Sequence, residues 1–168
     1  MNVQKAALLI VLGVISVIGF IYISFDRKEI VNSREDLENL EIVQEWNLPK
    51  ILDEVSGIAL LDKDRVAAVQ DEDGIIFIYN LKDSKIEKQI EFGDEGDYEG
   101  IALAGSTAYV LRSDGNIFEV LNFNEENRQT REIETEIKGE YNFEGLCFDK
   151  KNNRLLIAAK EKAKGNYK

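Results

Sequence analysis

Hydrophobic positions fall into one long uncharged run near the N-terminus and many short runs after it. The long run, residues 6–25, has no charged residue in 20 positions. As a helix it would rise about 30 Å, the thickness of a bilayer hydrocarbon core. It is longer than the apolar region of a signal peptide, and no A-x-A-like cleavage site follows it. We therefore predict an uncleaved transmembrane helix, with residues 1–25 as the anchor and residues 6–25 in contact with the lipid bilayer.

Residues 26–43 are rich in charge and are expected to form a linker. Ser33 opens a sequence that resembles a helix-capping box, so a short helix and a charged stalk are both open interpretations. A short N-terminal tail with the bulk of the chain translocated is the usual topology for such an anchor. We therefore expect a single-pass protein of the plasma (inner) membrane, with its C-terminal domain on the periplasmic or extracellular side.

The short apolar runs after the linker repeat in a fixed order. Three segments align on Gly57, Gly100 and Gly145, which are 43 and 45 residues apart. A second apolar run follows each glycine, and the first two repeats add a third apolar run and a fourth that alternates with charges. Continuous runs such as residues 75–79 suit strands covered on both faces, whereas alternating runs such as residues 85–92 suit exposed sheet edges. Four short strands in such a period are typical of a β-propeller blade.

The pattern thus predicts an all-β fold, a partial β-propeller of about two and a half four-stranded blades over residues 44–168, preceded by one transmembrane α-helix. The fourth strand of the second repeat is expected to reach residue 137. A propeller needs at least about four blades to close. We therefore expect a domain truncated at its C-terminus, and pairing with another chain is the alternative.

Charge and composition limit the kinds of partner and catalytic site that the chain can have. Acidic residues outnumber basic ones 32 to 21, for a net charge of −11, so no nucleic-acid partner is expected. The chain has no histidine, which removes Ser-His-Asp and Cys-His catalysis and histidine-ligated zinc. The single cysteine, Cys147, lies in an apolar run and is expected to be a buried small hydrophobe.

Acidic residues recur where the innermost strand of each blade would begin, at the mouth of a central channel. Glu99 and Glu144 directly precede the second and third repeat glycines, and Asp71, Asp97 and Asp114 fall on nearby loops. Convergent carboxylates without histidine suit a hard cation, above all calcium, so these five residues are candidate metal ligands. The alternative is that they satisfy turn amides and solvate loop tips.

Two basic residues follow the second strand of their repeats. Arg112 and Lys160 are expected at matching places and are candidate ligands for an anion. Salt bridges to neighbouring glutamates are the alternative.

Several segments together carry a family resemblance: residues 48–60, 69–74, 96–102, 109–115 and 142–146. They resemble the SdiA-regulated (YjiK-like) family, over residues 44–168, the N-terminal portion of that domain. The resemblance implies a membrane-anchored periplasmic propeller, of unestablished biochemical function, related to phytase-like propellers. The first repeat departs from the pattern, with Ser56 where the others have glutamate.

Two functions follow. The first is an extracytoplasmic module that binds a small molecule, a metal or a protein at the channel mouth. The alternative is a calcium-dependent, phytase-like phosphoester hydrolase, which needs basic phosphate-binding residues as well as acids. Basic residues near the expected site are few, so we favour binding over catalysis.

Overall fold

The computed structural model describes residues 41–137 and 142–160. The predicted anchor and most of the predicted linker lie outside these residues. In the part of the chain that is described, no helix is long and apolar enough to cross a membrane. The chain divides into two units, Met1–Glu45 and Trp46–Lys168, and every described strand belongs to the second.

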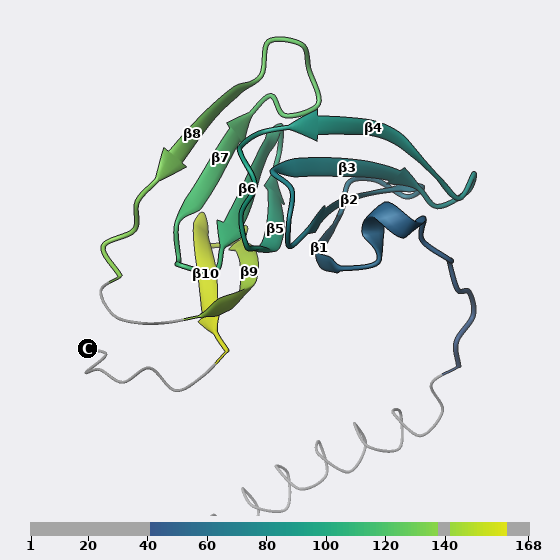
Figure 1. Ribbon diagram of the computed structural model, residues 1–168, viewed down its shortest axis with the longest axis horizontal. Coiled ribbons are helices and arrows are strands. Elements are labelled where there is room, and N and C mark those ends of the chain that lie inside the picture. Colours follow the sequence, from purple (N-terminus) through teal and green to yellow (C-terminus); the bar gives the residue numbers. More distant parts are fainter. Residues whose placement is uncertain (1–40, 138–141, 161–168) are drawn as a thin grey trace, which may run out of the picture. The chain divides into compact units, whose positions relative to one another are not determined.

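The prediction of an all-β fold is confirmed, because the strands form three antiparallel sheets (Figure 1). A 3-10 helix, η1 (Lys50–Leu52), precedes them. The first sheet has the order β1 (Val55–Leu60), β2 (Arg65–Gln70), β3 (Ile75–Asn80) and β4 (Lys85–Glu91). The second has the order β5 (Tyr98–Ala104), β6 (Thr107–Arg112), β7 (Ile117–Leu121) and β8 (Gln129–Ile133). The third contains β9 (Phe143–Asp149) and β10 (Arg154–Ala159).

The strands follow the predicted repeats, with one clear difference at the end of the second repeat. The fourth strand was expected to reach residue 137, but β8 ends at Ile133. Beyond it, the Thr135 hydroxyl donates a hydrogen bond to the Gly115 carbonyl, at 2.9 Å. The chain therefore bonds to the β6–β7 loop there and no longer to the ladder.

The three sheets pack face to face in sequence order. We call the face toward the preceding sheet the front face and the face toward the following sheet the rear face. The rear face of the first sheet and the front face of the second share one apolar core, which includes Val69, Ile76, Ile101, Val110 and Phe118. A second core joins the second and third sheets through Leu111, Ile117, Phe143, Leu146 and Ile157.

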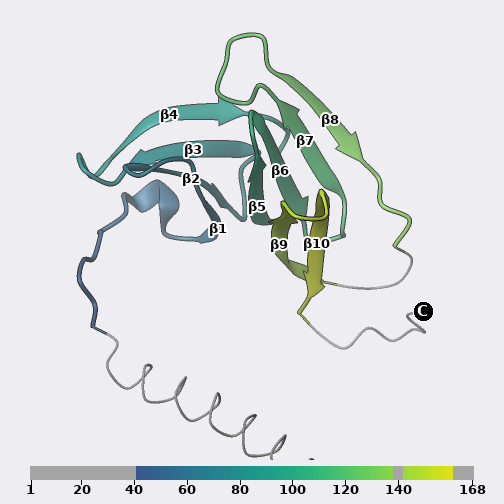
Figure 2. The ribbon, with the colours of Figure 1, turned by 180° about the vertical axis from the view of Figure 1, so that it is seen from behind.

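The repeat glycines allow the first strands of successive sheets to approach one another. A β-carbon on Gly57 would lie 2.8 Å from the Gly100 α-carbon, and one on Gly100 would lie 3.0 Å from the Leu146 β-carbon. Both separations are tighter than ordinary carbon–carbon contacts. This close approach explains the glycine spacing from which the repeats were recognised. Figures 1 and 2 show β1, β5 and β9 gathered together, with β4 and β8 on the outside.

A segment that precedes the first strand covers part of the front face of the first sheet. Leu52 of η1 is buried with Phe77 and Tyr79, and Leu48 packs against the same cluster. The Trp46 indole N–H donates to the Leu81 carbonyl at 2.7 Å. Residues 46–52 therefore cover part of the front face of the first sheet. The corresponding front face of the second sheet is covered by the first sheet instead.

Candidate functional site

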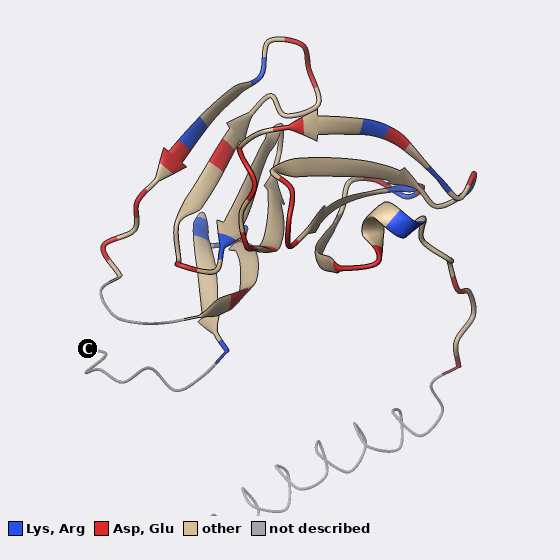
Figure 3. Ribbon diagram, in the orientation of Figure 1, with Lys and Arg blue, Asp and Glu red and all other residues tan. Residues whose placement is uncertain are grey.

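The starts of β1, β5 and β9 lie at the same end of the stacked sheets as three loops that carry only negative charge. Backbone hydrogen bonds run along this end: the Ser113 amide donates to the Asp97 carbonyl within the second sheet, at 2.8 Å, and the Phe143 amide of the third sheet donates to the Ser113 carbonyl, at 3.0 Å. The loops β2–β3, β4–β5 and β6–β7 contain seven acidic residues and no lysine or arginine: Asp71, Glu72, Asp73, Asp94, Glu95, Asp97 and Asp114. We call this the acidic end; its loops are red in Figure 3.

The residue before each repeat glycine is bulged out of its ladder. The β1–β2 register passes from Val55 to Gly57 and skips Ser56. The β5–β6 register skips Glu99 in the same way, and the β9–β10 register skips Glu144. A bulge re-aims the side chain of the extra residue and recurs beside functional sites. The same device thus sets a polar residue at the start of three adjacent strands.

Glu99 lies at the centre of this row. Its pKa is raised, first by partial burial and then by repulsion from Asp97 and Glu144, and a hydrogen bond with Asp97 adds to the effect. Lys160 acts in the opposite direction on Glu99 and forms an ion pair with Glu144, with 2.5 Å between Nζ and Oε1. Glu99, Asp97 and Glu144 therefore form a coupled group of carboxylates with Lys160 at its edge.

Ser56 uses the equivalent position to hold two strands together. Its hydroxyl lies 2.6 Å from the Tyr98 carbonyl and 3.4 Å from the Val69 carbonyl, and it can donate to either. The first repeat has serine where the other two have glutamate. At this position it therefore contributes a contact between strands and no carboxylate.

A second acidic region surrounds a shallow cavity of about 400 Å³, lined by Asp71, Glu72, Asp73, Glu95 and Gly96. Its loop is organised by Gln70, which is only 4% exposed. The Gln70 side-chain oxygen accepts from the amides of Glu72 and Asp73, and its nitrogen donates to Asp73 Oδ2 at 2.7 Å. Sequence analysis did not single out Gln70, although an amide side chain before an acidic turn is a loop-organising signal.

Asp114, by contrast, forms an ion pair with Arg112, which lies two residues before it in the chain. Arg112 donates to Asp114 at 2.8 Å and to Glu132 at 2.7 Å, and its guanidinium lies 5.3 Å from the centre of the Phe118 ring. Partial burial opposes ionisation of Asp114, but hydrogen bonds from Arg112 and from the Asn116 amide outweigh it and lower the pKa. Arg112 and Lys160 therefore both form the ion pairs given as the alternative to anion binding.

Arg112 and Lys160 were expected at matching positions of the second and third sheets, and this prediction is wrong by one residue. Arg112 pairs with Tyr98 in the ladder, whereas the residue that pairs with Phe143 is Ala159. Lys160 instead donates its amide to the Asn142 carbonyl, as Ser113 does to Asp97. Side chains alternate along an extended chain, so the two cations serve different neighbours.

The five predicted metal ligands thus fall into three places. Glu99 interacts with Asp97 and with Glu144, Asp71 lines the shallow cavity, and Asp114 is paired with Arg112. Within residues 41–137 and 142–160, no group of three or more carboxylate or cysteine side chains is placed to hold a metal ion. Asp71 Oδ1 is buried and finds no hydrogen-bond partner among these residues.

Cys147 is exposed, contrary to the prediction that it is buried. It lies on the rear face of the third sheet, which no described residue covers. The apolar run around it was identified correctly, but its burial depends on a neighbouring sheet.

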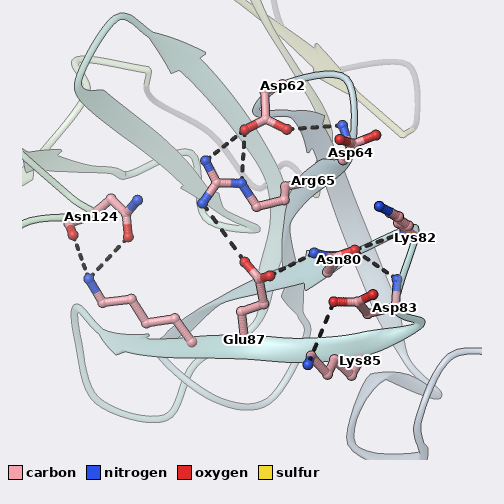
Figure 4. Close-up of polar contacts among 10 residues, drawn as sticks. Asp62, Asp64, Arg65, Asn80, Lys82, Asp83, Lys85, Glu87 and Asn124 are labelled. Atoms are coloured by element: carbon pink, nitrogen blue, oxygen red, sulfur yellow. Dashed lines mark hydrogen bonds and ion pairs between the residues drawn. The ribbon is translucent and has the colours of Figure 1, made fainter.

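The opposite end of the first sheet has a different electrostatic character (Figure 4). Arg65 donates to Asp62 at 2.6 Å and lies 3.8 Å from Glu87, which also accepts from Asn80 at 2.7 Å. The hydrogen bond from Arg65 lowers the pKa of Asp62. We call this group, Asp62, Arg65, Asn80 and Glu87, the paired cluster. Its acids have cationic or amide partners.

Comparison with known proteins gives no further guide: no family model and no curated protein matches the chain.

Proposed function

We propose that this chain is a membrane-anchored, extracytoplasmic binding module of the SdiA-regulated (YjiK-like) kind, and that its acidic end binds a positively charged ligand. The sheets are interpreted as successive blades of a partial β-propeller. Three features support this: a four-stranded antiparallel order that occurs twice and begins again, contacts between β1, β5 and β9 at the repeat glycines, and a bulge at the same place in each.

The observation that carries the binding proposal is the coupled group at the bulges. Three adjacent first strands each present the residue before the glycine, and one of these residues, Glu99, is repelled by the second, Glu144, and by Asp97. A cation would relieve this repulsion, because it interacts favourably with each carboxylate that it approaches. Seven acids and no base on the adjoining loops extend the negative potential and would attract such a ligand from solution.

The ligand class is a protonated amine, a basic peptide or a hard metal ion. A basic ligand needs no fixed coordination geometry, which agrees with the scattered positions of the acids. Calcium would need six to eight oxygens, more than Asp97, Glu99 and Glu144 can be expected to supply, so other ligand atoms would have to complete its shell.

Thermal melting of the full chain in detergent tests binding, with spermidine and calcium chloride as probes at constant ionic strength. We expect spermidine to raise the melting temperature of the wild type and to have much less effect on the double variant Glu99→Gln/Glu144→Gln. The matched control is Glu125→Gln/Glu126→Gln, which removes the same charge from exposed residues of the β7–β8 loop. Equal shifts in the two variants, or no shift in the wild type, would refute the proposal.

The same samples test the hydrolase alternative. Phosphate release from a phosphomonoester is measured with and without calcium, and no calcium-dependent turnover is expected. Turnover that is lost in Glu99→Gln/Glu144→Gln would favour the hydrolase instead.

The proposed topology is tested separately, with a cysteine introduced by Glu126→Cys in a Cys147→Ala background. A membrane-impermeant maleimide should label this variant from outside intact cells. Labelling only after lysis would place the domain in the cytoplasm.

A further inference from the structure

A cation of the chain itself lies at the acidic end, and its place follows from the register of the strands. In each sheet, one residue directly follows the ladder partner of the residue that begins the first strand: Asp71 in the first sheet, Ser113 in the second and Lys160 in the third. Two sheets thus present a carboxylate or a hydroxyl at this place, whereas the third presents an ammonium group.

In the third sheet this ammonium group meets the bulged glutamate. Lys160 Nζ lies 2.5 Å from Glu144 Oε1. The Lys160 amide donates to the Asn142 carbonyl at 2.8 Å, which fixes the backbone from which the side chain extends. The charge of Lys160 also acts on Glu99 of the neighbouring sheet, where it opposes the rise in the pKa. A carboxylate of the proposed binding site is therefore already in contact with a primary ammonium, the group that a polyamine or a basic peptide carries.

The second sheet differs at the equivalent place. Its bulged glutamate, Glu99, has Ser113 where the third sheet has Lys160, and a hydroxyl carries no positive charge. The guanidinium of Arg112, next in the chain, is paired with acids of its own sheet. The cation in contact with a bulged glutamate thus comes from the third sheet.

We propose that Lys160 is a built-in competitor for the positively charged ligand: its ammonium group occupies Glu144, and the ligand has to displace it to reach that carboxylate. This inference rests on the proposed function, because it names what regulates the same site. Two cations that approach one carboxylate repel each other. Lys160 therefore weakens binding at Glu144 and directs the ligand's positive charge toward Glu99 and Asp97.

Thermal melting of the full chain in detergent tests the proposal, with spermidine as the probe. The readout is the spermidine concentration that gives half of the maximal shift. Lys160→Gln removes the ammonium group and should lower this concentration about two- to fivefold, as for the loss of an exposed ion pair. Lys160→Arg keeps the charge and should behave like the wild type. The matched control is Lys151→Gln, which removes the same charge from an exposed position in the β9–β10 loop, beyond the other end of β9.

The outcomes separate this inference from the proposed function. A wild type that does not respond to spermidine would refute the proposed function, and the competitor with it. If the wild type responds but Lys160→Gln and Lys151→Gln are half-saturated at the same concentration, the competitor alone is overturned. Weaker binding by Lys160→Gln would overturn it too, because Lys160 would then assist the ligand. Half-saturation is read within each variant, so a change in melting temperature without spermidine does not alter the comparison.

Discussion

Negative charge is arranged in opposite ways at the paired cluster and at the acidic end. At the paired cluster, Arg65 and Asn80 hold Asp62 and Glu87, and the pKa of Asp62 is lowered. At the acidic end, Glu99 faces Asp97 and Glu144, and its pKa is raised. The acids of the paired cluster have partners within the chain, whereas partial burial and then repulsion from neighbouring carboxylates raise the pKa of Glu99 at the acidic end. The acidic end is therefore the place where the ligand of the proposed function would bind.

The largest expected effect comes from disturbing the close approach that gathers the acids. In Gly57→Ala, the new β-carbon would meet the backbone of Gly100, at 2.8 Å, so β1 and β5 must separate. Overpacking of this kind costs about 1–3 kcal/mol. Urea unfolding should show this loss and a weaker response to spermidine.

Gly105→Ala is the control for that substitution. Gly105 has a φ of +63°, but a β-carbon there would meet no atom within 4 Å. It should cost only the backbone penalty, about 1 kcal/mol, and leave the spermidine response intact. A smaller loss for Gly57→Ala than for Gly105→Ala would show that the strands can separate freely.

A somewhat smaller effect is expected at the loop of the shallow cavity. Gln70→Ala removes the partner of two loop amides and of Asp73, and an unsatisfied buried polar group costs about 1–3 kcal/mol. Water can reach part of this loop, so a value in the lower half of that range is expected. Gln89→Ala, at an exposed position of β4, should unfold like the wild type. Equal unfolding midpoints for the two variants would show that Gln70 does not stabilise the loop.

The smallest effect, but the sharpest contrast, lies in the pH dependence. Because the pKa of Glu99 is raised on folding, its contribution to stability is fully present below the pKa of the unfolded chain and is lost as the pH rises through the folded pKa. Glu99→Gln should therefore gain stability relative to the wild type as the pH rises above the ordinary glutamate pKa, about 4.3, and melting temperatures over a pH series would show the gain.

Asp62→Asn at the paired cluster should show the opposite sign. The pKa of Asp62 is lowered on folding, so the stabilisation is present above the unfolded pKa and is lost as the pH falls through the folded one. The variant should be less stable than the wild type at neutral pH and approach it in acid, as followed by melting temperature. If the stability difference from the wild type changed with pH in the same direction for both variants, the acidic end and the paired cluster would not differ as described.

Much of the fold could be predicted from the sequence because it depends on short-range patterns. The run of apolar residues at positions 75–79 specified a strand buried on both faces, and residues 76–79 of β3 are indeed buried. The alternating residues 85–92 specified an edge, and β4 alternates between exposed and covered side chains. The spacing of Gly57, Gly100 and Gly145 indicated three equivalent first strands, and at Gly57 and Gly100 a β-carbon would press against the first strand of the next sheet.

Only the tertiary structure decided which charges meet. The bulges at Ser56, Glu99 and Glu144 depend on pairing between strands, and a single inserted residue is invisible in the pattern of one strand. The offset of Lys160 from Arg112 has the same origin, and the capture of Asp114 by Arg112 depends on a loop that folds back on its own strand. The exposure of Cys147 depends on whether another sheet covers it. Strand identity is thus a local property of this chain, whereas register and burial are properties of its neighbours.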